Sequence, residues 1–264
     1  MNEHWLALMM GNSRLHWAWF VGNTLQQAWD INHLPAARVE QLIQRWALGV
    51  LPEEILPPLL VSQALDTSRQ LPLYLASVTP DRAKLWQAYP ATKIITLEQL
   101  PLLGLYPTLG IDRALAVFGA GETLGYPVLV IDAGTALTFT GADTHRQLIG
   151  GAILPGLKLQ LQSLAKNTAA LPEIQLPTQL PRRWALHTSG AIESGVIYTV
   201  LAGIRDFVKD WQAQFPKSPI ALTGGDAHVL FAYLQTQVPQ NTHPFIVDPY
   251  LIFWGMRSLR AMGE

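Results

Sequence analysis

The chain has 264 residues, a length typical of one large domain or two small ones with a sizeable core. Its net charge of −1 argues against binding to a nucleic-acid backbone, which normally requires a basic surface. The absence of cysteine excludes disulfides, thiolate nucleophiles and Cys-ligated zinc, and we recognise no signal peptide or membrane-spanning segment. Only 14% of the residues are charged, against about 25% in ordinary soluble domains, so we expect a cytoplasmic oligomer without nucleic-acid or membrane partners.

The first third of the chain alternates predicted strands and helices, as α/β proteins do. Apolar runs bounded by turn residues predict strands at residues 6–10, 15–20, 71–78 and 93–97. The spacing of apolar residues predicts helices at 36–48 and 81–89. Residues 101–110 are apolar but contain two prolines and two glycines, so we expect an ordered loop there.

From residue 111 on, longer helices surround a second set of predicted strands. Asp112 is expected to cap a helix that ends near residue 124. Strands are expected at 128–131, 136–140 and 219–222, and helices at 190–215 and from a cap at Asp226 to about 235. Asp248 and Pro249 predict the N-cap and the first residue of a final helix.

Two segments repeat one pattern nearly half a chain apart. Residues 6–20 and 129–143 each combine an apolar strand, a glycine-centred polar turn and a second strand. Alignment of Gly11-Asn12 with Gly134-Thr135 places Met9 opposite Asp132. The repeat predicts a duplicated domain with one such hairpin in each half. A chance similarity between two ordinary hairpins is the alternative.

Both turns have a potential chemical use. A glycine next to Asn, Ser or Thr exposes main-chain N–H groups beside a side-chain donor, and these can cradle a phosphate. Two such turns facing each other would hold the phosphates of a nucleotide, and Asp132 could bind a cation directly or through water. Taken singly, each turn is explained more simply by ordinary hairpin chemistry.

The sequence Gly110-Ile111-Asp112-Arg113 places an acid beside a base at the start of a predicted helix. The carboxylate can accept a proton from a hydroxyl, and the guanidinium can hold an anion. From spacing alone, a capping aspartate beside an exposed arginine is the simpler interpretation. The loop at 223–226 is either nucleotide-facing or a plain strand-to-helix turn. No His-x-x-x-His pair, Gly-x-Ser-x-Gly elbow, Walker loop or Gly-x-Gly-x-x-Gly fingerprint occurs in the sequence.

Nine segments in order resemble the motifs of the type III pantothenate kinases, most closely those of the cyanobacterial branch. They lie at residues 11–13, 77–80, 110–113, 132–135, 150–156, 168–172, 188–195, 223–225 and 248–251 and so span nearly the whole chain. The resemblance implies an α/β protein with the actin-like fold of sugar kinases, acetate kinases and chaperone ATPases. That fold has two ribonuclease-H-like halves with a nucleotide cleft between them, here residues 1–124 and 125–264.

The resemblance implies ATP-dependent phosphorylation of the primary hydroxyl of pantothenate to 4′-phosphopantothenate, the first step of coenzyme A biosynthesis. By matching position, Asp112 is the general base, and the substrate contacts are Gly110, Ile111, Asp112, Arg113, Thr188 and Tyr106. The implied ATP contacts are Met9, Met10, Gly11, Asn12, Ser13, Arg14 and Thr135. Asp132 matches the ligand of a monovalent cation, K⁺ or NH₄⁺, which acts beside Mg²⁺. Family members are dimers that share the substrate pocket across their interface, so a homodimer is implied as well.

One position departs from the family pattern. The family normally begins Asp-x-Gly-Asn-Thr, and Met9 stands where that aspartate lies near the metal and the phosphates. Methionine cannot order a hydrated magnesium ion, so one source of charge neutralisation is lost. Either Asp132 and water replace it, or the protein is a catalytically degenerate nucleotide-binding regulator of the same fold. Another small-molecule kinase of the superfamily would lack the matches at 110–113 and at Thr188.

Overall fold

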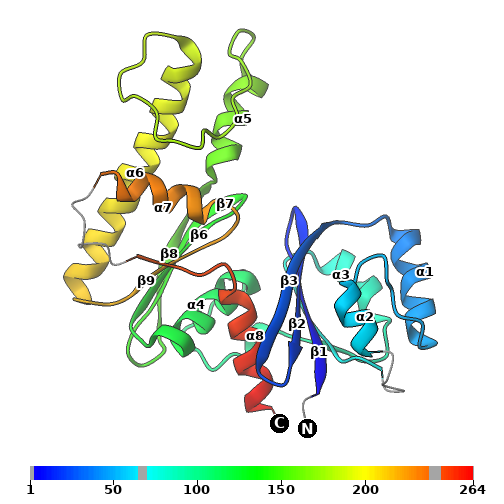
Figure 1. Cartoon of the computed structure of the whole chain (residues 1–264). Coiled ribbons are helices and arrows are strands. Elements are labelled where there is room, and N and C mark those ends of the chain that lie inside the picture. The colour runs from blue at the N-terminus through cyan, green and yellow to red at the C-terminus, as the bar shows by residue number, and fades with distance from the viewer. Residues whose placement is uncertain (1–2, 65–69, 238–244, 264) are drawn as a thin grey trace. The chain divides into compact units, whose positions relative to one another are not determined.

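The computed structural model describes residues 3–64, 70–237 and 245–263, which form two compact units. The first unit comprises residues 1–101, 106–119 and 252–264, and the second comprises 102–105 and 120–251. Each unit is built on one five-stranded sheet (Figure 1). The C-terminal helix belongs to the first unit by its contacts, whereas the sequence-based division between residues 124 and 125 assigns it to the second half. That division stays a prediction.

The sheet of the first unit has a central strand that is buried on both faces. In spatial order its strands are β3 (Thr24–Asn32), β2 (Arg14–Val21), β1 (His4–Met10), β4 (Leu73–Ser77) and β5 (Thr92–Ile94). β1 is antiparallel to β2 and parallel to β4, and apolar residues fill it because helices cover both of its sides.

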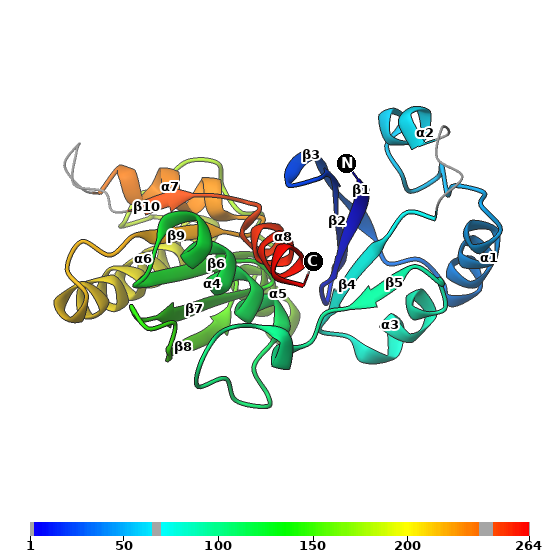
Figure 2. The same cartoon turned by 90° about the horizontal axis from the view of Figure 1, so that it is seen from below.

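Helices α1 (Ala36–Ala47) and α3 (Pro80–Gln87) cover one face of this sheet, and α8 (Leu251–Met262) covers the other (Figure 2). On the α8 face, Phe20 packs edge-on against Trp254, with ring centroids 6.2 Å apart. The unit also contains α2 (Pro58–Ala64), a 3₁₀ turn at Leu97–Gln99 and the first turns of α4 (Ile111–Leu124).

The sheet of the second unit repeats the arrangement of the first. Its strands in spatial order are β8 (Leu148–Pro155), β7 (Ala136–Ala142), β6 (Val128–Ala133), β9 (Ile220–Thr223) and β10 (Phe245–Val247). β6 is antiparallel to β7 and parallel to β9. Helices α6 (Thr188–Gln214) and α7 (Ala227–Gln235) bury apolar side chains against this sheet, and α5 (Leu157–Asn167) follows β8.

The two sheets have the same strand order and the same strand directions, so the predicted duplication is confirmed. The last pair of the first hairpin is Met10 with Leu15, and the last pair of the second is Ala133 with Leu137. Met9 and Asp132, one residue earlier on each central strand, are therefore topologically equivalent, as the alignment predicted.

Two predicted caps are wrong. α4 begins at Ile111, so Asp112 lies inside the first turn of the helix rather than before it. α8 begins at Leu251, because residues 248–250 form a separate turn in which the Tyr250 N–H donates to the Asp248 carboxylate at 2.8 Å. β3, β8, β10, α2 and α5 are further elements that the sequence patterns did not predict.

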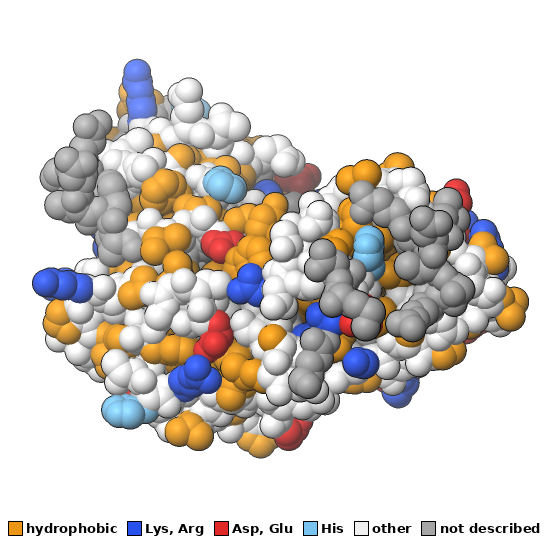
Figure 3. All heavy atoms as spheres, turned by 60° about the horizontal axis from the view of Figure 1, so that its bottom comes forward, with side chains coloured by type: hydrophobic (Ala, Val, Ile, Leu, Met, Phe, Trp, Pro, Cys, Tyr) orange, Lys and Arg blue, Asp and Glu red, His pale blue; other side chains and the backbone are white. Residues whose placement is uncertain are grey.

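The surface adds two observations. Among the described residues, no helix combines the length and the apolar character needed to cross a membrane. Among the described residues on the face that Figure 3 shows, lysine and arginine side chains are scattered between acidic, apolar and neutral ones.

Candidate active site

The turn between β1 and β2 is tight and reaches the surface. Met10 and Leu15 close the hairpin as its last pair, and the Gly11 N–H donates to the Arg14 carbonyl at 3.0 Å. Residues 12–14 are exposed, so the main chain and side chains of the predicted phosphate-binding turn are accessible. A chain bend of this kind can present N–H groups to an anion.

Met9 lies in the interior rather than at this surface. Its side chain is 1% exposed, and its neighbours across the sheet are His16 on β2 and Ala76 on β4. The side chain of Met10 is equally buried and belongs to the core beneath α1 and α3. A nucleotide at this turn would therefore reach these two residues only through their main chain.

A histidine that the sequence analysis did not single out lies against the turn. The Nδ1 atom of His16 is 2.8 Å from Oδ1 of Asp30, and its Nε2 atom is 3.3 Å from where a Cβ on Gly11 would stand. The hydrogen bond and charge of His16, with the nearby charge of Arg14, lower the pKa of Asp30. Asp30 thus orients the imidazole of His16 toward the turn. On the neighbouring strand, His16 is the residue directly opposite Met9. A polar residue inside the otherwise apolar run of β2 was the available signal.

The predicted substrate residues before and at the start of α4 form one cluster. The Arg113 N–H donates to Oδ1 of Asp112 at 2.8 Å, and Nη1 of Arg113 donates to the Tyr106 hydroxyl at 3.1 Å. Arg113 is only 7% exposed, so the alternative of a capping aspartate beside an exposed arginine is wrong. Gly110 and Ile111 supply the main chain that begins the helix.

The environment of Asp112 favours proton acceptance. Burial raises the pKa of this carboxyl, and the hydrogen bond and charge of Arg113 oppose part of that effect. A carboxylate with a raised pKa binds a proton more strongly, as a general base must. The cluster therefore combines a base, a cation and a phenol within a single unit.

The second hairpin carries the predicted cation ligand and is held by glycines of neighbouring segments. A Cβ on Gly224, whose φ is +90°, would lie 2.3 Å from Oδ1 of Asp132 and 2.7 Å from the Ala133 carbonyl carbon. The Gly156 N–H donates to the Thr135 carbonyl at 2.9 Å. The main chain just after β8 and just after β9 therefore lies directly against the turn at 132–135, closer than a residue with a Cβ could approach.

The loop after β9 packs on the same turn. The Asp226 N–H donates to the Ala133 carbonyl at 2.9 Å, and the buried Asp226 carboxylate accepts from Nζ of Lys158 at 2.6 Å. Asp226 precedes α7 as predicted, but its side chain makes no capping hydrogen bond, because it pairs with α5 instead. Lys158 was not predicted, since 68 residues separate it from its partner and no local pattern marks it.

Thr188 is exposed at the first residue of α6 in the second unit. His187 caps this helix, because its Nδ1 atom accepts from the Gly190 N–H at 3.1 Å. Within the first unit the structure thus assembles residues 9–14 in one hairpin and Tyr106 with 110–113 in one cluster. Within the second unit it assembles Asp132 and Thr135 in one turn and leaves Thr188 on a separate helix end.

The second turn offers one carboxylate, that of Asp132, as a candidate cation ligand. Among the described residues, no group of three or more His, Asp or Glu side chains could hold a metal ion. Asp132 is a single, half-buried carboxylate beside the main chain of residues 133 and 224. A single carboxylate can supply an oxygen ligand to K⁺, whereas Mg²⁺ held by the protein itself would require more oxygen ligands.

Comparisons with known proteins identify the family of the chain. A model of the type III pantothenate kinase family matches residues 5–210. A type III pantothenate kinase of Nostoc sp. is 48% identical over 272 residues, covering 99% of this chain and 96% of the relative. The corresponding enzyme of Synechocystis sp. is 44% identical, covering 97% and 90%.

Solved structures share the fold at low sequence identity. A protein of Campylobacter jejuni described as a Baf family transcriptional activator is 20% identical, with a TM-score of 0.61 over 98% of both chains. MreB 5 of Spiroplasma citri bound to AMPPNP is 10% identical, with a TM-score of 0.53 over 99% of this chain and 97% of that one. The predicted actin-like fold is confirmed.

Proposed function

The chain belongs to the type III pantothenate kinase family, and we propose that it transfers the γ-phosphoryl group of ATP to the primary hydroxyl of pantothenate with Asp112 as general base. The observation that carries the residue assignment is the cluster at the start of α4. It holds a carboxylate with a raised pKa beside a buried arginine that is tied to Tyr106.

In the proposed reaction, the substrate hydroxyl gives its proton to Asp112 while its oxygen attacks the γ-phosphorus. The bond from that phosphorus to the bridging oxygen breaks, and ADP leaves with the electron pair. Arg113 and Tyr106 hold the polar groups of pantothenate, which fixes the hydroxyl next to the base. The products are ADP and 4′-phosphopantothenate.

Each hairpin by itself offers groups that could bind ATP. The turn at 11–14 offers main-chain N–H groups to the phosphates, and Thr135 offers a hydroxyl from the second turn. Asp132 would hold K⁺ or NH₄⁺, and Mg²⁺ would arrive with the nucleotide and neutralise phosphate charge. Since the first hairpin has a methionine in place of the family carboxylate, Arg14 and His16 are the groups beside this turn that could supplement that neutralisation.

A homodimer is part of the proposal. Trp184 is 86% exposed and Leu186 is fully exposed, and both lie in the segment that leads to Thr188, the first residue of α6. Large apolar side chains in water favour burial against a second copy, which would also bring Thr188 into a shared substrate pocket. A sedimentation experiment that finds only the mass of one chain would contradict the dimer. The cytoplasmic location that composition favours stays a prediction.

Replacement of Asp112 tests the assignment. Asp112→Asn keeps the size of the side chain but cannot accept a proton, so turnover of ATP with pantothenate should fall about 10²–10⁴-fold. Asp81→Asn, an exposed aspartate on α3, is the matched control and should retain activity. Because the pKa of Asp112 is raised, kcat/KM of the wild type should decline on acidification at a higher pH than an ordinary aspartate would give.

Retention of full turnover by Asp112→Asn would remove the base from the mechanism. The regulator hypothesis rests on Met9 and predicts a different result, namely nucleotide binding without phosphorylation of any acceptor. Parallel assays with pantothenate, a panel of sugars and no acceptor separate these functions. Absence of pantothenate phosphorylation under every cation tested would favour the regulator.

A further inference from the structure

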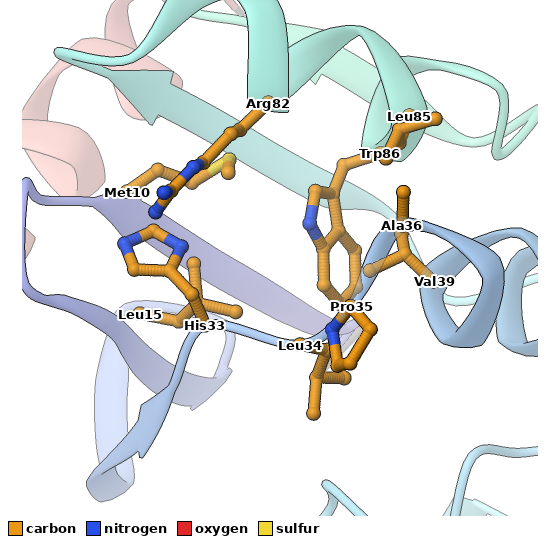
Figure 4. A pocket seen from close by; sticks show the side chains of 10 residues that line it. All are labelled: Met10, Leu15, His33, Leu34, Pro35, Ala36, Val39, Arg82, Leu85 and Trp86. Carbon is orange, nitrogen blue, oxygen red and sulfur yellow. The ribbon is translucent and has the colours of Figure 1, made fainter.

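A cavity of about 440 Å³ lies behind the first hairpin turn, on the side of the sheet that α1 and α3 cover. Its walls come from the ends of β1 and β2, from the segment that leads into α1 and from α3 (Figure 4). Most of the lining is apolar: Met10, Leu15, Leu34, Pro35, Ala36, Val39, Leu85 and Trp86. The volume is within the range of sites that bind small organic molecules.

One wall of this cavity is cationic. Figure 4 shows the guanidinium of Arg82 extended toward the imidazole of His33, with the nitrogen-bearing edge of Trp86 facing both from the other side. Among the described residues, no carboxylate pairs with Arg82, and the neighbouring Asp81 binds Lys84 at 2.9 Å. A guanidinium next to an apolar cavity is complementary to a ligand that joins one anionic group to an apolar body.

The cavity differs in position from the site proposed for catalysis. Successive residues of a strand point to opposite faces of its sheet, and Met10 belongs to the core beneath α1 and α3. The aromatic residues Trp5 and Phe20 mark the other face, where they pack with residues of α8. A ligand in the cavity would therefore contact the back of the hairpin and not the exposed residues of its turn.

Contacts nevertheless link the cavity to that turn. Nε2 of His33 is 2.9 Å from the Gly11 carbonyl, which can only accept, so this nitrogen carries the proton and donates. Met10 and Leu15, the pair that closes the hairpin, form part of the wall. We propose that the cavity binds a small molecule with one anionic group and an apolar body, and that occupancy changes the binding of ATP at the turn. The second part rests on the proposed function, and the first does not.

Two dyes that differ by one charge test the site itself. Anilinonaphthalene sulfonate carries an apolar body and one anion, and N-phenylnaphthylamine has a closely similar body without the anion. The wild type should bind both with saturable fluorescence. Arg82→Met should weaken the sulfonate about tenfold or more and leave the uncharged dye nearly unchanged, because only the anion uses the guanidinium.

Matched variants locate the binding. Arg45→Met removes one positive charge from the neighbouring helix α1, away from the cavity, and leaves Glu54 paired with Arg38, so it should bind both dyes like the wild type. Ala36→Trp fills the cavity with an indole and should weaken both dyes, with circular dichroism and thermal melting confirming that each variant is folded. Unchanged sulfonate affinity in Arg82→Met, or unchanged affinity for both dyes in Ala36→Trp, overturns the site.

Titration of ATP with the dye present tests the link to the turn. Saturating sulfonate dye should change the apparent affinity for ATP in the wild type but not in Arg82→Met, measured by calorimetry so that no turnover is needed. Dye binding without any change in ATP affinity overturns the link and leaves the site standing. Failure of pantothenate phosphorylation would affect neither measurement, so this inference and the proposed activity fail separately.

Discussion

The two central hairpins occupy the same place in two sheets of the same topology, but they present different chemistry. In the second unit the position carries Asp132, half-buried and backed by the main chain at Gly224. In the first unit the equivalent position carries the buried Met9, and the polar group lies across the hairpin on His16. Duplication has kept the backbone frame, while the side chains at corresponding positions have diverged.

The two turns are also held in different ways. The second turn packs directly against the main chain at Gly156 and Gly224. A Cβ on either glycine would overlap with atoms of the turn. The first turn is held by side chains, since His33 donates to the Gly11 carbonyl and His16 lies on the other side of the same residue. Close main-chain packing at Gly156 and Gly224 leaves no room for a Cβ. Side-chain contacts such as those of His33 and His16 can instead be removed by single substitutions.

Restoring the missing carboxylate should have the largest effect. Met9→Asp would make the two hairpins alike in sequence, but the site is only 1% exposed. Burial of a carboxylate without a built partner should lower the free energy of unfolding by about 3–5 kcal/mol. Met9→Leu, which keeps volume and polarity, should lower it by less than about 1.5 kcal/mol. Chemical denaturation of both variants measures the difference.

A stable and faster Met9→Asp enzyme would reverse this interpretation. It would mean that His16, directly across the hairpin, pairs with the new carboxylate and that the position remained available to a metal ion. Assays of the magnesium requirement in that variant would then distinguish a restored ligand from a harmless substitution.

The close packing of Gly224 against the second turn gives the next prediction. Gly224→Ala introduces a Cβ 2.3 Å from the Asp132 carboxylate at a φ of +90°, so it combines strain with overlap. We expect it to lower the free energy of unfolding by about 2–4 kcal/mol and to reduce turnover. Gly225→Ala is the control, because nothing lies within 4 Å of its added Cβ. Equal melting temperatures for the two variants would show that the turn can shift to accommodate the added Cβ without loss of stability.

Much of the arrangement of the two central hairpins could be predicted from the sequence. The apolar runs around Gly11 and Gly134 identified both hairpins, and their alignment gave the equivalence of Met9 and Asp132. β3 and β8 were not predicted, because no residue of β3 is fully buried, and in β8 exposed and half-buried residues alternate around two adjacent glycines. Neither pattern produces the continuous apolar run that marked the central strands.

The chemical site was predictable only in part. The motif at 110–113 and Tyr106 came from resemblance to a family, and the structure adds that Arg113 is buried and bonded to Tyr106. The pairs His16–Asp30 and Lys158–Asp226 could not be predicted, because their members are 14 and 68 residues apart and meet only through the sheet and helix arrangement.

The carboxylate of the second hairpin should make the enzyme respond to the monovalent cation. Rates in K⁺ or NH₄⁺ should exceed the rate in Na⁺ by about tenfold, which corresponds to about 1.4 kcal/mol of transition-state stabilisation. Asp132→Asn should remove this difference and leave the melting temperature in sodium buffer nearly unchanged. Equal rates of the wild type in all three buffers would return Asp132 to a structural role.

The smallest effect is expected at the first hairpin, where His16 has water on one side. If its imidazole contacts an ATP phosphate, His16→Asn should raise KM for ATP about three- to tenfold with a smaller change in kcat. His145→Asn is the control, since His145 also lies beside an aspartate but on an exposed turn of the second unit. Asp30→Asn should reproduce part of the effect, because Asp30 acts only by orienting the ring.

The lowered pKa of Asp30 means that its pairing with His16 stabilises the fold above the ordinary carboxyl pKa. This contribution disappears as the pH falls through the lowered value, so the stability difference between wild type and Asp30→Asn should vanish in strong acid. A KM for ATP that is unchanged in His16→Asn would leave the main-chain N–H groups as the whole of the phosphate contact on this hairpin.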